Sequence, residues 1–144
     1  MVLNGYGQIA HEEWLRSEAV RSELRLDAFV VMPNHIHGIV FLDGQKGDLP
    51  VAPTPVNGPR ARSLSSFIGG YKSTVTRCVN RRKPVGATGR SPAVGAVQTI
   101  WQRNYHDHIV RNDGELTKIR QYIMDNPRHW ETDDHHPSQD KRDI

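Results

Sequence analysis

Hydrophobic residues recur along this chain at spacings that predict three helices. Apolar side chains interleave with charges over residues 8–24, and a clearer amphipathic stripe runs over residues 63–82. A last helix is expected over residues 114–126, because Asn112 and Glu115 form a capping pair at its start and a proline follows its end.

Two further segments show the composition of strands. Residues 26–32 and 35–42 are rich in β-branched and aromatic side chains, and a Met-Pro-Asn interruption separates them. Residues 99–110 alternate loosely and predict one or two short strands. Residues 44–60 and 84–97 are dense in glycine, proline and small residues and are expected to be loops. The order of elements indicates an α+β fold with helices packed on an antiparallel sheet.

Length and composition set the class of protein. The 144 residues suit one domain, expected over residues 1–130 and followed by a polar, disordered tail over residues 131–144. The single cysteine, Cys78, argues against a disulfide framework and a zinc ribbon. No apolar run approaches the roughly 18 residues of a membrane span, and the N-terminus lacks a signal pattern. We therefore expect a cytoplasmic protein without a membrane partner.

Charge is distributed unevenly along the chain. The formal net charge is only +3, yet the stretch from Leu49 to His106 contains no acid and nine arginines and lysines. Such a block repels itself unless an anionic partner neutralises it. Nucleic acid is the leading candidate for that partner, although a solvated basic surface has the same composition.

The pair His35 and His37 is the sharpest local feature. Side chains two apart on a strand point to the same face, so the two imidazoles are expected to share one metal ion. An isolated pair of this kind also arises by chance among core or surface histidines. The segment His106-Asp107-His108 is a rival metal pair.

The last predicted helix carries a second candidate. Leu116, Ile119 and Ile123 form its apolar stripe, and Tyr122 and Asn126, four residues apart, share a face beside that stripe. A tyrosine in this position is more often structural, with its ring buried and its hydroxyl in water.

Taken together, these segments resemble the REP-associated tyrosine transposases, a branch of the single-strand transposases of the HUH class. The resemblance runs in order over nearly the whole chain, and it is most specific around the histidine pair and Tyr122. The matching segments are Phe29-Val-Val-Met-Pro-Asn-His-Ile-His-Gly-Ile-Val, Phe67-Ile-Gly-Gly-Tyr-Lys-Ser, Trp101-Gln-Arg-Asn-Tyr, His108-Ile-Val-Arg-Asn and Ile119-Arg-Gln-Tyr-Ile-Met-Asp-Asn-Pro.

The resemblance implies a metal-dependent DNA transposase. Tyr122 would be the nucleophile that forms a 5′-phosphotyrosine link, and His35, His37 and Asn126 would bind Mg²⁺ or Mn²⁺. The DNA would be single-stranded or hairpin DNA, such as repetitive extragenic palindromes, and related transposases often act as homodimers. The alternatives are an inactive remnant that only binds hairpin DNA, and a phosphoesterase that uses water as its nucleophile.

The same resemblance implies a ferredoxin-like sheet with the helices packed on one face. Family members carry a strand ahead of the part that starts here near Leu3, so the usual N-terminal strand is expected to be absent. The candidates for contact with DNA phosphates are basic side chains spread over the second half of the chain. They are Lys72, Arg77, Arg81, Arg82, Arg103, Arg111 and Arg120.

Overall fold

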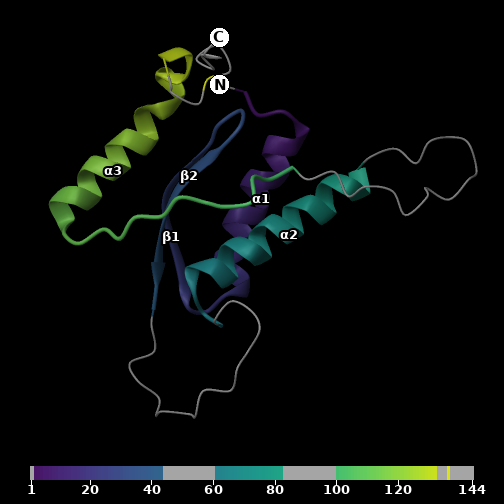
Figure 1. Ribbon diagram of the computed structural model, residues 1–144, viewed down its shortest axis with the longest axis horizontal. Helices are drawn as coiled ribbons and strands as arrows, with labels where there is room; N and C mark the ends of the chain where they lie inside the picture. The colour runs from purple at the N-terminus through teal and green to yellow at the C-terminus, as the bar shows by residue number, and fades with distance from the viewer. Residues whose placement is uncertain (1, 44–60, 83–99, 133–135, 137–144) are drawn as a thin grey trace, which may run out of the picture.

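The computed structural model describes residues 2–43, 61–82, 100–132 and 136 (Figure 1). Within these residues the chain forms helices α1 (Gly5–Val20), α2 (Leu64–Arg82) and α3 (Asp113–Asp125) and strands β1 (Leu24–Val31) and β2 (Ile36–Leu42). Two 3-10 turns, η1 (Asn126–Arg128) and η2 (Trp130–Thr132), follow α3. The described part is a mixed α/β fold with a two-stranded antiparallel sheet, which agrees with the expected α+β class. None of its helices combines the length and apolarity needed to cross a membrane.

The helix ends are set by side-chain caps. Helix α1 begins at Gly5, three residues before the predicted start, because the side chain of Asn4 accepts hydrogen bonds from two backbone N–H groups of the first turn. At α3 the predicted cap is confirmed, since Asn112 Oδ1 accepts a 2.9 Å hydrogen bond from the backbone N–H of Glu115. The predicted loops 44–60 and 84–97 lie outside the described residues, as does most of the tail predicted over residues 131–144.

The hairpin of β1 and β2 contains a β-bulge that keeps apolar side chains on one face. Leu26 pairs with Val40 and Phe29 pairs with Gly38, so β1 advances three residues while β2 advances two. In a regular strand, residues three apart would point to opposite faces. The extra residue in β1 restores the alternation, and Leu26 and Phe29 both pack against the same core.

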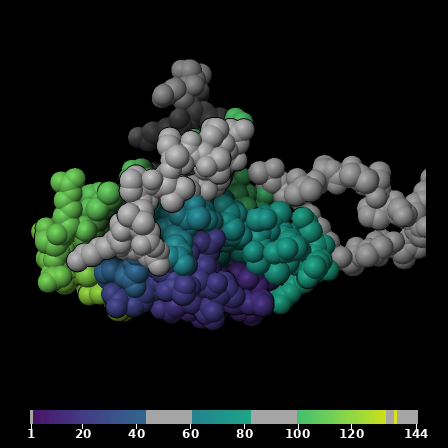
Figure 2. Space-filling view, turned by 90° about the horizontal axis from the view of Figure 1, so that it is seen from below, coloured from purple at the N-terminus to yellow at the C-terminus, as the bar shows by residue number. Residues whose placement is uncertain are grey.

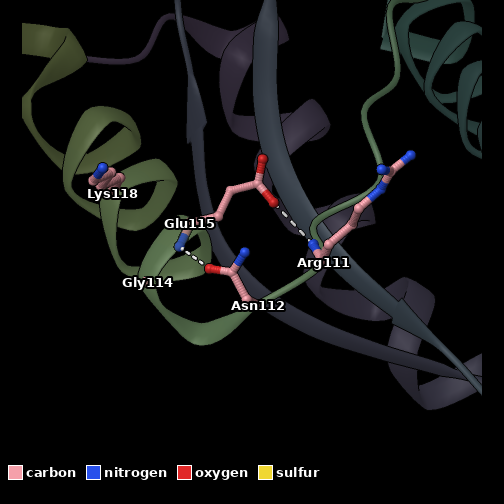
Figure 3. Close-up of a pocket in the computed structure, with 5 residues that line it drawn as sticks. All are labelled: Arg111, Asn112, Gly114, Glu115 and Lys118. Carbon is pink, nitrogen blue, oxygen red and sulfur yellow. Dashed lines mark hydrogen bonds between the residues drawn. The ribbon is translucent and has the colours of Figure 1, made fainter.

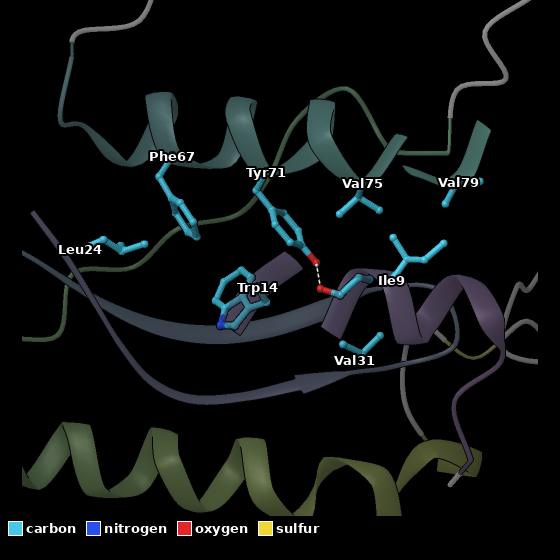
Figure 4. Close-up of a cluster of buried hydrophobic side chains, with 9 residues drawn as sticks. Ile9, Trp14, Leu24, Val31, Phe67, Tyr71, Val75 and Val79 are labelled. Carbon is cyan, nitrogen blue, oxygen red and sulfur yellow. Dashed lines mark hydrogen bonds between the residues drawn. The ribbon is translucent and has the colours of Figure 1, made fainter. Parts of the chain in front are cut away.

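The main core lies between the hairpin and helices α1 and α2 (Figure 4). Its centre is Trp14 of α1, whose ring centroid lies 5.2–5.6 Å from those of Phe29, Phe67 and Tyr71. The Tyr71 hydroxyl donates a 2.9 Å hydrogen bond to the carbonyl of Ala10, and burial raises the pKa of this phenol. The stripe predicted for the second helix is therefore its core-facing side, with Phe67, Tyr71, Val75 and Val79 buried.

Helix α3 covers the other face of the hairpin. It contacts β1 and β2, and Figures 1 and 4 place it on the side away from α2, while Figure 2 shows the hairpin and α1 between the two helices. The expectation of helices on one face holds for α1 and α2 but not for α3. The physical reason is that the alternate side of β2 is also apolar: Ile39 is buried there, and Ile123 of α3 is buried as well.

The segment before α3 differs from its prediction. Residues 100–110 contain no strand, and two of their carbonyls accept hydrogen bonds from a side chain of α2. Lys72 Nζ donates hydrogen bonds to the carbonyls of Gln102 (2.9 Å) and Asn104 (3.1 Å). The Trp101 indole N–H donates one of 3.1 Å to the carbonyl of Lys72. The chain therefore crosses from α2 to α3 as an extended segment (Figure 1).

Candidate active site

The two histidines lie together at the end of the hairpin. His37 belongs to β2, whereas His35 stands in the turn just before it, where its carbonyl accepts a 2.8 Å hydrogen bond from the backbone N–H of Met32. Their ring centroids are 4.6 Å apart and their planes are inclined at 79°. Both Nε2 atoms are buried. The structure therefore brings the predicted pair together, although His35 lies outside the strand.

The orientation of His35 depends on a residue that sequence reasoning did not single out. Asn34 Oδ1 lies 2.7 Å from His35 Nδ1. An amide oxygen only accepts hydrogen bonds, so this contact suits the tautomer that has its proton on Nδ1 and its lone pair on Nε2. Metal-binding histidines are commonly held in this way by a hydrogen bond at the other ring nitrogen.

Helix α3 places Tyr122 against the histidines. The Tyr122 ring centroid lies 5.4 Å from that of His37, with the planes inclined at 76°. Tyr122 is nevertheless 55% exposed, so a ligand as large as a nucleic acid can reach it from solvent. Tyr122 and His37 are 85 residues apart in the sequence. The structure brings their rings together, as the sequence analysis expected.

Asn126 follows one helical turn after Tyr122, at the junction of α3 and η1. It is only 4% exposed, and within the described residues its Oδ1 atom is buried and accepts no hydrogen bond. Leaving a buried polar atom unsatisfied costs about 1–3 kcal/mol. The lone pairs of this oxygen can therefore accept a cation or a hydrogen bond from an ordered water.

Trp130 completes the surroundings of His35. It lies in η2, and its ring centroid is 6.0 Å from that of His35. Sequence reasoning missed it because it precedes a polar tail. Because Pro127 ends the predicted helix, no helical spacing relates Trp130 to Tyr122, and its approach to His35 is seen only in three dimensions.

The rival pair does not form a comparable site. His108 Nε2 lies 2.7 Å from Glu115 Oε1 at the protein surface. The backbone N–H of Arg111 and the His108 ring lower the pKa of Glu115. In the part of the chain that the structure covers, no three His, Cys, Asp or Glu side chains are grouped for a metal.

Two of the predicted DNA-contacting cations have partners inside the protein. Lys72 binds the segment before α3, as described above. Arg120 Nε donates a 2.9 Å hydrogen bond to Asp27 Oδ1, and a second guanidinium nitrogen bonds the other carboxylate oxygen. The hydrogen bond from Arg120 lowers the pKa of Asp27, and the hydrogen bond to Asp27 raises that of Arg120. The remaining candidates are exposed: Arg77, Arg81, Arg82, Arg103 and Arg111.

Three of these exposed arginines lie on α2, and a fourth lines a pocket at the start of α3. Arg77, Arg81 and Arg82 belong to α2, which lies on the opposite side of the hairpin from α3, the helix that carries Tyr122 (Figure 1). Arg111 lines an open pocket at the N-terminal end of α3 together with Lys118, a cation that sequence reasoning did not name (Figure 3). No residue of the histidine site lines this pocket.

Comparison with known proteins finds one informative similarity. The chain shares 32% identical residues over 136 positions with an uncharacterized protein of Haemophilus influenzae, and the match covers 92% of this chain and 71% of that protein. Since only about 8% of the chain is left out, the aligned region includes everything from His35 to Trp130. No family model matches the chain. No solved structure matches it.

Proposed function

We propose that this chain, which belongs to the same family as the uncharacterized protein of Haemophilus influenzae, is a metal-dependent DNA transposase that cuts and rejoins single-stranded or hairpin DNA. The observation that carries the proposal is the position of Tyr122, whose ring stands 5.4 Å from His37 beside the histidine pair. A phenol that is exposed to solvent and adjacent to the imidazole of His37 is suited to attack a phosphate held at the histidine pair. The resemblance to the REP-associated tyrosine transposases supports the same assignment.

The residues at the site fit a divalent metal ion. His35 and His37 would supply two imidazole nitrogens and Asn126 an amide oxygen. Asn126 Oδ1, buried and without a hydrogen bond from the described residues, has the acceptor capacity that such an ion requires. Two nitrogens and one oxygen select weakly among metals, so Mg²⁺ would bind by abundance and Mn²⁺ more tightly. When bound, the ion supplies charge that polarises a phosphate oxygen and orients the scissile bond.

Tyr122 performs the covalent step. Its phenolic oxygen forms a bond to phosphorus while the bond from phosphorus to the 3′ oxygen of the neighbouring nucleotide breaks. The phenol loses its proton, the leaving 3′ oxygen gains one, and the protein is left joined to the 5′ phosphate. Because one phosphate ester replaces another, the step is reversible and rejoins strands without ATP.

The order of elements supports a ferredoxin-like relationship. Helix α1, strands β1 and β2 and helix α2 follow one another as in the middle of the β-α-β-β-α-β arrangement, with α1 and α2 on one face of the sheet. Helix α3 is an addition on the other face that brings Tyr122 to the histidines. A homodimer belongs to this proposal through the resemblance.

A covalent adduct tests the function. The protein is incubated with Mn²⁺ and labelled hairpin oligonucleotides with randomised single-stranded flanks, and adducts that resist denaturation are recovered. We expect an adduct with the wild type and none with Tyr122→Phe. Tyr6→Phe is the matched control, because Tyr6 is 57% exposed on α1, and we expect it to keep the adduct.

The other outcomes identify the alternatives. Retention of the hairpin without an adduct would indicate a remnant that binds DNA but does not cut it. Cleavage that survives Tyr122→Phe and leaves no protein on the DNA would indicate a water nucleophile and refute the proposed role of Tyr122.

A further inference from the structure

Trp130 is a large aromatic side chain at the site that the covalent step leaves without a role. It is half-buried, and it does not belong to the main core around Trp14. Its ring centroid lies 6.0 Å from that of His35 and 4.9 Å from that of His136. A movement of this side chain toward a ligand would not disturb the main core.

Tyr122 and Trp130 neighbour different members of the histidine pair. Tyr122 neighbours His37 at 5.4 Å, Trp130 neighbours His35 at 6.0 Å, and the two histidine rings are 4.6 Å apart. A phosphate held over the histidines would then have the phenol beside it next to His37 and the indole beside it next to His35.

The direction of phosphoryl transfer then decides which nucleotide meets Trp130. Attacking and leaving oxygens lie roughly in line on opposite sides of phosphorus. With Tyr122 attacking from the His37 side, the leaving 3′ oxygen departs on the His35 side. We propose, resting on the proposed function, that Trp130 stacks on the base of the leaving nucleotide, the one that ends in the free 3′-hydroxyl.

Stacking at this place serves the reverse reaction. After cleavage the 5′ part is joined to Tyr122, whereas the leaving strand has no covalent link to the protein. An indole face holds any base, because every base presents a π-face. Trp130 therefore keeps the 3′-hydroxyl near the phosphotyrosine without reading the sequence, and the hydroxyl can attack phosphorus to restore the strand.

The test couples a change in the protein to a change in the DNA. The hairpin oligonucleotide recovered in the adduct assay, with its cleavage position mapped, is synthesised with an abasic site either at the leaving nucleotide or at the nucleotide on the other side of the scissile phosphate. Affinity is measured with Mn²⁺ in a Tyr122→Phe background, in which no covalent link forms. Trp130→Ala, Trp130→Phe and Trp130→Leu are compared, with Trp101→Phe as the control away from the histidines.

We expect Trp130→Ala to weaken binding of the intact hairpin by about 5- to 150-fold, the range that corresponds to loss of one base–aromatic stack. The loss should shrink to nearly nothing when the leaving nucleotide is already abasic, and it should persist when the other nucleotide is abasic. Trp130→Phe should retain most of the affinity, whereas Trp130→Leu, which has the volume without the π-face, should not. With Tyr122 intact, Trp130→Ala should also lower the fraction of adduct that rejoins.

Each contrary result is distinct. Equal losses on intact and abasic hairpins, or equal behaviour of the Phe and Leu variants, would show that Trp130 only packs against the site. Coupling to the other nucleotide would overturn the assigned direction. A wild type that forms no adduct with any hairpin would instead overturn the proposed function, and the inference with it. If Trp130→Ala does not fold, the comparison of Phe with Leu decides alone.

Discussion

Among the glycines of the described residues, Gly38 is the one at which an added Cβ should lower the stability most. It stands in β2 directly after His37, and it faces the main core. A Cβ built on Gly38 would lie 2.4 Å from Trp14 Cζ2 and 2.8 Å from Trp14 Cη2, well inside van der Waals contact. Gly38→Ala therefore forces either the indole or the strand to move.

The indole has little room to yield. Trp14 is 4% exposed, and it is enclosed by the rings of Phe29, Phe67 and Tyr71. Overpacking of a tight core costs about 1–3 kcal/mol, and a ring caught on all sides belongs at the upper end of that range. Alanine regains roughly 0.5–1 kcal/mol over glycine in a strand. We expect a net loss of about 2 kcal/mol of unfolding free energy.

Urea unfolding and thermal melts measure this loss, with Gly69→Ala as the matched control. Gly69 lies in α2 with nothing within 4 Å of its added Cβ, so the same substitution should stabilise the protein by about 1 kcal/mol. For a domain of this size the two melting temperatures should move in opposite directions, by roughly 4 °C per kcal/mol. A Gly38→Ala protein as stable as the wild type would show that Trp14 does not rest on this strand as described.

Three further predictions concern other contacts. Tyr71→Phe should lower the unfolding free energy by about 1 kcal/mol in urea titrations, because the buried Ala10 carbonyl loses its 2.9 Å hydrogen bond; an unchanged value would contradict the bond. The hydrogen bond from Arg120 lowers the pKa of Asp27 below its ordinary value of 3.8. Their ion pair therefore stabilises the fold at pH values above 3.8, and this stabilisation is lost as the pH falls through the lowered pKa. The wild type should thus lose more stability on acidification than Asp27→Asn, and parallel pH curves would count against the pair. Asn126→Ala should weaken Mn²⁺ binding by at least about tenfold in calorimetric titration, and equal affinity would remove it from the ligand set.

Features that depend on local spacing could be predicted from the sequence. The core side of α2 follows from the recurrence of Phe67, Tyr71 and Val75, since three or four residues make one helical turn. The approach of His35 and His37 follows in the same way from their separation of two residues. The rings meet even though His35 lies in the turn, because the turn leads straight into β2.

Contacts between residues that are far apart in the sequence could not be predicted. Arg120 and Lys72 appeared as candidates for DNA phosphates, but each meets a partner far away in the sequence, Asp27 in one case and the carbonyls of the segment before α3 in the other. Periodicity likewise cannot say which face of a hairpin a helix will cover. The apolar stripe of α3 could cover either face of the hairpin. It covers the face that carries Ile39, and this choice is visible only in the three-dimensional structure.

The candidate site and the main core therefore depend on different contacts. The core closes between α1, α2 and one face of the hairpin, whereas the histidines meet Tyr122 only while α3 is docked on the other face. Burial of Ile123, worth about 1.5–3 kcal/mol, and the ion pair of Arg120 hold that docking. A change in the ion pair acts on the site while leaving the core packed. A change at Gly38 acts on both, because the strand that presses on Trp14 is also the strand that carries His37.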